Sequence, residues 1–273
     1  MTGADGYELL DAGDGRRLER FGNRVVDRPA PAATDRRRAG PTAWAHSDLR
    51  FDRDAGWTGS VSSWPIELDG LTLELRPTEA GGLGLFPEHR LFWPFLAEAI
   101  GAADERRVLH LFASTGATTL ALARAGAQVT HVDASRPSVG WARHNAELSG
   151  LAGAPVRWIV DDAVAFTRRE ARRRRRYDGI VLDPPSYGHG PAGRRWELAD
   201  ALPDLLDAVM EVAAEEAFVL LTAHTTGLSA DDLGEALDDA AHGRGRITVE
   251  DVALDATSGA RLPAGVAARM ILR

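Results

Sequence analysis

The stretch from Val108 to Asp133 constrains the fold more than any other part of the chain. It begins with the near-continuous apolar run Val108–Phe112, which is typical of a strand buried on both faces. Small residues follow, and then the strong helix formers Ala117–Arg124 and a second short apolar strand, Gln128–Val132. We therefore predict a strand, a tight loop, a helix and a second strand of a parallel sheet.

The ends of these two strands indicate a nucleoside site. Asp133 follows the second strand, about 20 residues beyond the first turn, where an acid can accept hydrogen bonds from a ribose. A dinucleotide site needs G-x-G-x-x-G so that the backbone can approach a pyrophosphate, but this loop has only Gly116. A ligand with ribose and adenine but no phosphate fits better, and S-adenosylmethionine is the common one. An ordinary crossover with a surface aspartate is the alternative on this stretch alone.

Two further strands deliver polar residues to the same edge. The strand Val156–Val160 ends in Asp161-Asp162-Ala163, and Asp162 could accept from an adenine amino group or could stand in a surface turn. The strand Gly179–Leu182 ends in Asp183-Pro184-Pro185-Ser186-Tyr187. The prolines stiffen the backbone and donate no N–H, so nearby carbonyls are free to face a ligand. A rigid exit from the strand is the alternative interpretation.

The remaining pattern predicts a doubly wound α/β sheet. Helices are expected over residues 91–100, 137–149, 163–176, 199–213 and 230–240, a strand over 218–222, and a closing antiparallel pair over 247–254 and 266–272. The run Arg172–Arg176 ends a helix at the amino edge of the sheet, opposite the ligand edge. We interpret it as a solvated helix end helped by the helix dipole, outside the catalytic groove.

The sequence pattern of residues 1–85 differs from that of the rest of the chain. It predicts a small β-rich domain and linker before a larger domain at 86–273. Short candidate strands lie at 7–10, 24–26, 60–68 and 71–75, with an Asp69-Gly70 hairpin turn and an arginine-bearing arm at 29–41. Residues 79–90 are rich in glycine and interrupted by proline, which is typical of a linker. This segment could fold over the cofactor as a lid, with Phe86 and His89 nearest, or remain a plain linker.

Composition excludes several classes of function. The chain has no cysteine, which excludes disulfides, thiolate zinc sites and a catalytic thiol. Its net charge of −8 argues against broad attraction to nucleic acid, although a local basic site remains open. The sequence has no apolar run of membrane-spanning length, and its first residues do not resemble a signal peptide, so we expect a cytoplasmic protein without a membrane partner.

The motifs VLHLFASTGATTLALARAGA, THVDAS, RHNAELSGL, RWIVDDA and YDGIVLDPPSYG, with the early YELLDAGDGRRLERFG, occur in one order along the chain. Together they resemble class I S-adenosylmethionine-dependent methyltransferases of the group that includes large-subunit ribosomal RNA methyltransferases. The resemblance implies a mostly parallel seven-stranded sheet with an antiparallel last strand. It also implies ribose at Asp133, adenine near Asp162, methionine at the loop and the target at Asp183 to Tyr187. The cofactor-binding residues expected are Phe86, Phe112, Ala113, Ser114, Thr115, Gly116, Asp133, Ala134, Asp162, Ala163 and Asp183, and the catalytic ones are Asp183, Pro184 and Tyr187.

Three functional hypotheses follow. The leading one is methylation of a nucleobase nitrogen in RNA, in particular ribosomal RNA, because family members that methylate cytosine carbon 5 use a cysteine and this chain has none. The second is methylation of a small planar metabolite, which suits the acidic charge and the lack of an obvious RNA-binding module. The third is a noncatalytic nucleoside- or RNA-binding protein of the same fold. Displacement at a sulfonium needs positioning and desolvation, so no metal is expected.

Overall fold

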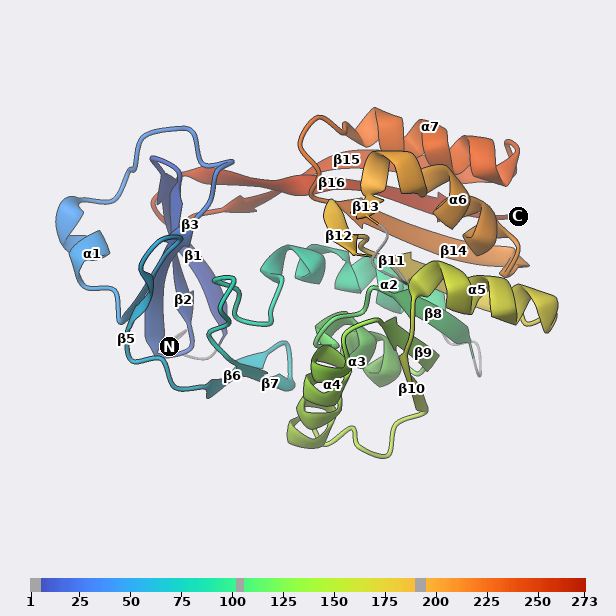
Figure 1. Ribbon diagram of the computed structural model, residues 1–273, viewed down its shortest axis with the longest axis horizontal. Coiled ribbons are helices and arrows are strands. Elements are labelled where there is room, and N and C mark those ends of the chain that lie inside the picture. Colours follow the sequence, from blue (N-terminus) through green and yellow to red (C-terminus); the bar gives the residue numbers. More distant parts are fainter. Residues whose placement is uncertain (1–5, 102–105, 190–194) are drawn as a thin grey trace. The chain divides into compact units, whose positions relative to one another are not determined.

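The computed structural model describes residues 6–101, 106–189 and 195–273. The chain divides into two compact units (Figure 1). The N-terminal unit runs to Arg90 and also includes Glu147–Gly150 and Ala253–Ala264, and the sheet unit consists of the remaining residues from Leu91 onward. The domain boundary expected after residue 85 stays a prediction. The two later insertions into the N-terminal unit were not expected.

The sheet unit is built on seven strands in the order β10-β9-β8-β11-β14-β16-β15. β8 to β11 and β14 pair in parallel, and β16 runs antiparallel to β14. The predicted doubly wound sheet with an antiparallel last strand is therefore confirmed. Its strands are β8 (Arg107–Leu111), β9 (Gln128–Asp133), β10 (Val156–Val160), β11 (Tyr177–Leu182), β14 (Ala213–Ala223), β15 (Arg246–Asp255) and β16 (Arg261–Ile271).

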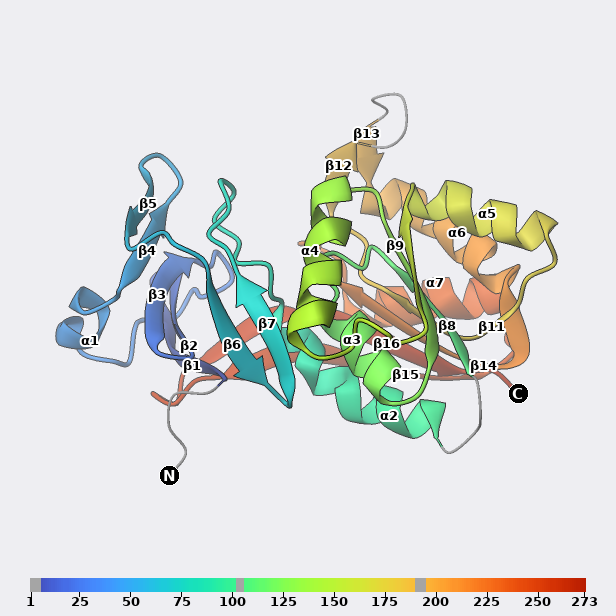
Figure 2. The same cartoon turned by 90° about the horizontal axis from the view of Figure 1, so that it is seen from below.

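Helices cover both faces of this sheet, as Figures 1 and 2 show. They are α2 (Trp93–Ile100), α3 (Ala117–Arg124), α4 (Arg136–Leu148), α5 (Ala163–Arg172), α6 (Leu198–Met210) and α7 (Ala230–Ala241). α5, α6 and α7 pack side by side, and α2 packs against α3. Ser229 caps α7 in a complete capping box with Asp232.

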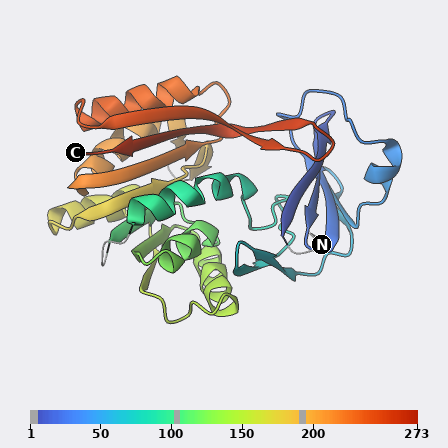
Figure 3. The ribbon, with the colours of Figure 1, turned by 180° about the vertical axis from the view of Figure 1, so that it is seen from behind.

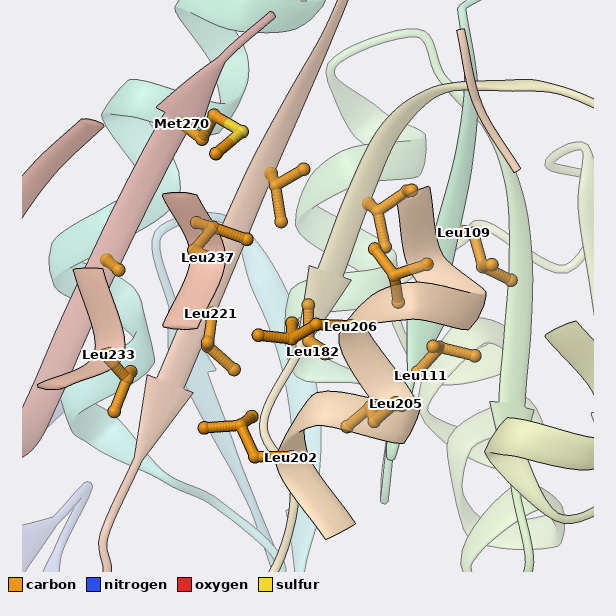
Figure 4. Close-up of a cluster of buried hydrophobic side chains, with 14 of the residues drawn as sticks. Leu109, Leu111, Leu182, Leu202, Leu205, Leu206, Leu221, Leu233, Leu237 and Met270 are labelled. Carbon is orange, nitrogen blue, oxygen red and sulfur yellow. The ribbon is translucent and has the colours of Figure 1, made fainter. Parts of the chain in front are cut away.

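One hydrophobic core of the sheet unit lies between the strands and the layer of α5, α6 and α7 (Figure 4). Leu109, Leu182 and Leu221 project from neighbouring strands and are fully buried, with 0% of each residue exposed. Because burial of a leucine side chain is worth about 1.5–3 kcal/mol, this layer fixes the strands and the positions of their carboxyl ends.

The end of α5 differs from the prediction. The expected helix continued to Arg176, but α5 ends at Arg172, with Arg173 as its C-cap. The Arg174 N–H donates to the Ala171 carbonyl at 2.8 Å and the Arg175 N–H donates to the Glu170 carbonyl at 3.0 Å. This is a Schellman motif, and Arg174 takes the left-handed conformation with φ +57°. Most of the arginine run is therefore a loop that enters β11.

The N-terminal unit has more strands than its sequence predicted. β1 (Tyr7–Gly13), β2 (Arg16–Phe21), β3 (Arg24–Pro29), β4 (Leu49–Asp52) and β5 (Gly56–Gly59) form one sheet in that order, and β6 (Trp64–Leu68) pairs with β7 (Leu71–Leu75). A short helix, α1 (Pro41–Ala45), and a 3-10 turn, η1 (Pro87–Phe92), complete the series. β2 was not predicted because it is charged, and its Glu19 is fully buried in an ion pair with Arg28 at 2.6 Å.

The tip of the hairpin formed by β15 and β16 supplies part of the N-terminal unit's core (Figure 3). Leu254 and Leu262 pack in one cluster with Leu9, and the Ser258 hydroxyl donates to Asp11 Oδ1 at 2.6 Å. The expected linker is also packed within this unit, because Leu83 is 0% exposed. Within the described ranges, no helix has both the length and the apolar character needed to cross a membrane.

Candidate active site

The loop after β8 has a backbone conformation that few residues adopt. Phe112, Ser114 and Gly116 have positive φ angles of 54°, 50° and 85°. The Ala113 N–H donates to the Val132 carbonyl at 3.1 Å, which ties the loop to the end of β9. Strain of this kind persists only where surrounding contacts enforce it, and it is common where backbone must face a ligand.

Gly116 is required by packing as well as by its φ angle. A Cβ atom added at Gly116 would lie 2.8 Å from the Ala142 Cβ of α4. The buried Asn145, one turn further along α4, donates from Nδ2 to the Thr115 carbonyl at 2.9 Å. α4 therefore holds the loop in place, a role for Asn145 that the sequence pattern did not reveal.

Asp133 lies at the carboxyl end of β9, directly beside the loop. Its Oδ2 accepts from the Ser114 N–H and its Oδ1 accepts from the Ser135 N–H, both at 2.8 Å. These bonds fix the orientation of a half-buried carboxylate. Since each carboxylate oxygen has two lone pairs, both oxygens of Asp133 can still accept a ribose hydroxyl. The next residue, Ala134, is exposed.

The acids after β10 have structural partners. Asp162 caps α5, because its Oδ1 accepts from the Ala165 N–H at 2.8 Å, and its own N–H donates to Asp161 Oδ1 at 2.9 Å. Asp161 pairs with Arg169. The small residue Ala163 is 5% exposed. Asp162 is thus a helix cap at the ligand edge of the sheet, and its second oxygen points to no partner among the described residues.

Asp183 at the end of β11 is held by the neighbouring strand β14. Thr222 donates from Oγ1 to Asp183 Oδ1 at 2.7 Å, and His224 Nε2 lies 3.4 Å from the same oxygen. The Asp183 side chain is 17% exposed, so it is partly shielded from water but reachable. Sequence reasoning missed Thr222 and His224, although the order of strands in a doubly wound sheet places the end of β14 next to the end of β11.

The segment after Asp183 is rigid. Pro184 is buried, and Tyr187 opens the short strand β12 (Tyr187–His189), which pairs with β13 (Arg195–Glu197). The expectation of free proline carbonyls is wrong for Pro185, because Trp196 donates from Nε1 to that carbonyl at 2.7 Å. The Trp196 ring lies 5.7 Å from that of Phe112, a second contact that the sequence did not suggest. The sequence also predicts a glycine-rich loop at 188–193, of which residues 190–193 lie outside the described residues.

Tyr187 and Phe86 are the two most exposed of the expected site residues with large side chains. Tyr187 is 62% exposed. Phe86 belongs to the N-terminal unit, is 45% exposed and stacks on His89 with ring centroids 5.6 Å apart. The exposed ring of Tyr187 can offer its face to a planar group.

A doubly wound sheet with a strained loop after its first strand and acids after the next strands defines a nucleoside-binding α/β enzyme. The comparison with protein families names the class more closely. Residues 14–225 match the model of the family described as S-adenosylmethionine-dependent methyltransferase, so the chain belongs to that family.

The relatives agree with this assignment. A crystal structure of the SAM-dependent methyltransferase from Agrobacterium tumefaciens is 34% identical, with a TM-score of 0.93 over 100% of this chain and 92% of that one. The structure of SMU.776 complexed with SAH has a TM-score of 0.78 at 17% identity and covers 98% of this chain and 76% of that one. At that identity the likeness shows the fold alone.

Curated relatives carry a more specific name. The Ribosomal RNA large subunit methyltransferase K/L of Shewanella amazonensis is 35% identical over 135 residues, which is 45% of this chain and 18% of that protein. The protein of the same name from Shewanella loihica matches to the same extent. The match spans less than a fifth of the length of these relatives.

The residues at the carboxyl edge fit the family's cofactor, S-adenosylmethionine. Asp133 offers two oriented carboxylate oxygens for a ribose diol, and the loop from Phe112 to Gly116 lacks the repeated glycines that a pyrophosphate requires. When bound, the cofactor supplies an electrophilic methyl group on a sulfonium. These residues are compatible with a phosphate-free nucleoside, and their assignment to the cofactor stays a prediction.

Proposed function

We propose that this enzyme methylates a nucleobase nitrogen in RNA, with ribosomal RNA as the source of that base. The observation that carries the proposal is the position of Asp183, an oriented carboxylate at the end of β11 in a chain that has no cysteine. The names of the curated relatives support RNA as the substrate class.

The proposed role of Asp183 is to hold the acceptor nitrogen. Two polar groups on one oxygen, from Thr222 and His224, fix the direction of the carboxylate. A carboxylate so fixed can accept an N–H of the base and aim the nitrogen lone pair, and it can take the proton that the nitrogen loses once it is methylated. The Pro184 carbonyl is a second acceptor on the same rigid segment, and Tyr187 can stack on the base.

The remaining assignments follow the same edge of the sheet. We propose that Asp133 binds the cofactor ribose, that Asp162 accepts from the adenine amino group beside Ala134 and Ala163, and that the loop from Phe112 to Gly116 surrounds the methionine moiety. Asp162 can serve both as the cap of α5 and as an acceptor, because capping uses only Oδ1. Phe86 stays a prediction for the cofactor site.

The choice of nitrogen over carbon rests on nucleophile chemistry. Carbon 5 of a pyrimidine becomes nucleophilic only after a thiolate adds to carbon 6, and a serine or threonine hydroxyl at neutral pH lacks the anion needed to replace it. The chain contains no thiol. A base nitrogen needs no such activation.

A small planar metabolite is the second candidate substrate, favoured by the net charge of −8. To separate the two candidates, purified protein and labelled cofactor are incubated with either large-subunit ribosomal RNA or a small-molecule extract. The RNA nucleosides are then analysed by mass spectrometry. We expect an N-methylated purine nucleoside, formed about a hundredfold more slowly by Asp183→Ala. Label found only in the small-molecule fraction would show that the substrate is a small metabolite. 5-Methylcytidine as the sole product would contradict methylation of a base nitrogen.

A further inference from the structure

The amino edge of the sheet unit concentrates positive charge. Five consecutive residues, Arg172–Arg176, lead from the end of α5 into β11, while Arg107 begins β8 and Arg157 lies in β10. Among the described residues, Glu170 and Asp178 offset them on the same segments, and Glu211, Glu215 and Glu216 lie nearby, at the end of α6 and in the first residues of β14. The chain as a whole carries a net charge of −8, so this edge, which we call the arginine edge, opposes the sign of the rest of the molecule.

Glu170 and Asp178, the two carboxylates on the same segments as these arginines, are already paired. The Glu170 side chain is 2% exposed and lies 2.9 Å from Arg173 Nη1 and 3.3 Å from Arg157 Nη1. Burial alone would raise the pKa of Glu170, but hydrogen bonds from Tyr177 and these arginines outweigh it and lower the pKa, so the carboxylate stays ionised. Asp178 accepts from the Arg107 N–H at 2.8 Å.

Three arginines remain after this pairing. Arg172, Arg174 and Arg175 are exposed, and among the described residues their side chains make no hydrogen bond or ion pair. The helix dipole accounts for cations in the last turn of α5, but Arg174 and Arg175 lie beyond it. Arg174 also occupies the left-handed position of the Schellman motif, where glycine would cost less.

A cavity of about 250 Å³ opens beside these residues. It is lined by the guanidinium-bearing residues Arg107, Arg157, Arg175 and Arg176 together with Gln128 and Thr130. Guanidinium forks bind phosphate oxygens in pairs, and amide and hydroxyl groups complete such sites. Glu170 also lines the cavity, but its charge is balanced by its own two arginines.

We propose that the arginine edge binds phosphates of the RNA backbone and so anchors the RNA while one base enters the site at the opposite edge. This inference rests on the proposed function, since it takes RNA as the substrate. A strand of five or six residues spans roughly 17–20 Å, so a single folded RNA segment reaches from one edge to the other. An otherwise acidic enzyme gains a local attraction for a polyanion in this way.

The test compares two double variants with the same change in charge. Arg174→Gln with Arg175→Gln removes two charges from the arginine edge, and Arg53→Gln with Arg261→Gln removes two exposed arginines from the N-terminal unit. The affinity for a large-subunit ribosomal RNA fragment is measured at several salt concentrations. We expect the edge variant to lower the slope of log K against log salt by about two and to weaken binding about tenfold at low salt. The control should match the wild type.

An equal loss of RNA affinity in both variants would show a general effect of charge. Unchanged RNA affinity in the edge variant would exclude phosphate contacts at the arginine edge. Loss of binding to vesicles containing phosphatidylserine, with RNA binding intact, would replace RNA by a membrane surface. Cofactor affinity should not change in either variant. If RNA binding behaves as expected but no methyl reaches RNA, the proposed function fails while the arginine edge stands as an RNA-binding surface.

Discussion

The two edges of the seven-stranded sheet carry opposite charges, and the charged side chains are held differently at each edge. At the carboxyl edge, Asp133, Asp162 and Asp183 are each fixed by backbone N–H groups or a neighbouring hydroxyl. At the amino edge, Arg174 and Arg175 are exposed side chains beyond the end of a helix. Chemistry at one atom needs fixed groups, whereas attraction of a polyanion does not. The comparison therefore predicts that carboxyl-edge changes alter catalysis and cofactor binding, while amino-edge changes alter stability and RNA affinity.

The largest effect should come from Asp183→Ala. Removal of an oriented polar group at a reacting centre lowers turnover by about two orders of magnitude. The affinity for the cofactor should change little, because Asp183 follows the strand beyond the nucleoside-facing acids. Turnover at saturating cofactor and calorimetric binding measure the two quantities separately.

The matched control for Asp183 lies at the other end of the same strand. Asp178 accepts from the Arg107 N–H at the amino edge, so Asp178→Ala should leave turnover unchanged. Equal losses in the two variants, or a collapse of cofactor binding in Asp183→Ala with turnover retained, would remove the functional distinction between the edges.

The next effect concerns Asp133→Ala. Hydrogen bonds to a charged group are worth about 1.5–3 kcal/mol, so loss of the ribose contacts should weaken cofactor binding roughly tenfold to a hundredfold. The variant also releases the Ser114 N–H, which loosens the loop after β8. Titration calorimetry on a variant with unchanged circular dichroism is the measurement, and an unaltered affinity would exclude Asp133 from the site.

The acids of the carboxyl edge were easier to predict from the sequence than the residues that hold this edge in place. Asp133, Asp162 and Asp183 were found because an apolar strand that ends in an acid leaves a local pattern. Thr222 and His224 are distant in sequence from Asp183, so their contact depends on strand order. Asn145 was visible only as one residue of a helical face, since its bond to Thr115 needs the tertiary structure.

The N-terminal unit was predicted least well, for a physical reason. β2 reads Arg-Arg-Leu-Glu-Arg-Phe, which lacks the apolar alternation of a half-buried strand, because Glu19 is buried with Arg28 as an ion pair. The tip of the hairpin at 253–264 joins this unit through contacts such as Ser258 with Asp11. No local pattern encodes a contact between residues so far apart in the chain.

A smaller effect, on stability alone, is expected for Glu170→Gln at the amino edge. The change removes the negative charge that contacts Arg157, Arg173 and Tyr177. Both arginines are more than half exposed, so water replaces part of the lost interaction. We expect a loss of about 1–2 kcal/mol in the free energy of unfolding by urea, with turnover unchanged. Asp204→Asn, which breaks an exposed pair with Arg168, should cost less. A Glu170→Gln variant of full stability but reduced turnover would contradict the division between the edges.

Between the two edges, the sheet interior should contribute a pH dependence through His131. This residue is fully buried and its Nδ1 lies 2.9 Å from Thr119 Oγ1, which also lies 2.7 Å from His110 Nδ1. Burial, helped by the charge of Arg143, lowers the pKa of His131 to about 3. Below pH 6.5 the unfolded chain therefore takes up a proton that the folded chain does not, and stability falls as pH falls towards 3. The free energy of unfolding should change with pH by at most about 1.4 kcal/mol per pH unit.

Urea unfolding of the wild type and of His131→Phe between pH 6.5 and 4.5 measures this slope, with the exposed His46→Phe as the control. The hydrogen bond of His131 is with Thr119 and not with the acids of the carboxyl edge. The variant should therefore lose the uptake of one proton on unfolding and keep its cofactor affinity at pH 7.5. An unchanged slope would show that His131 binds a proton in the folded chain as readily as in the unfolded chain.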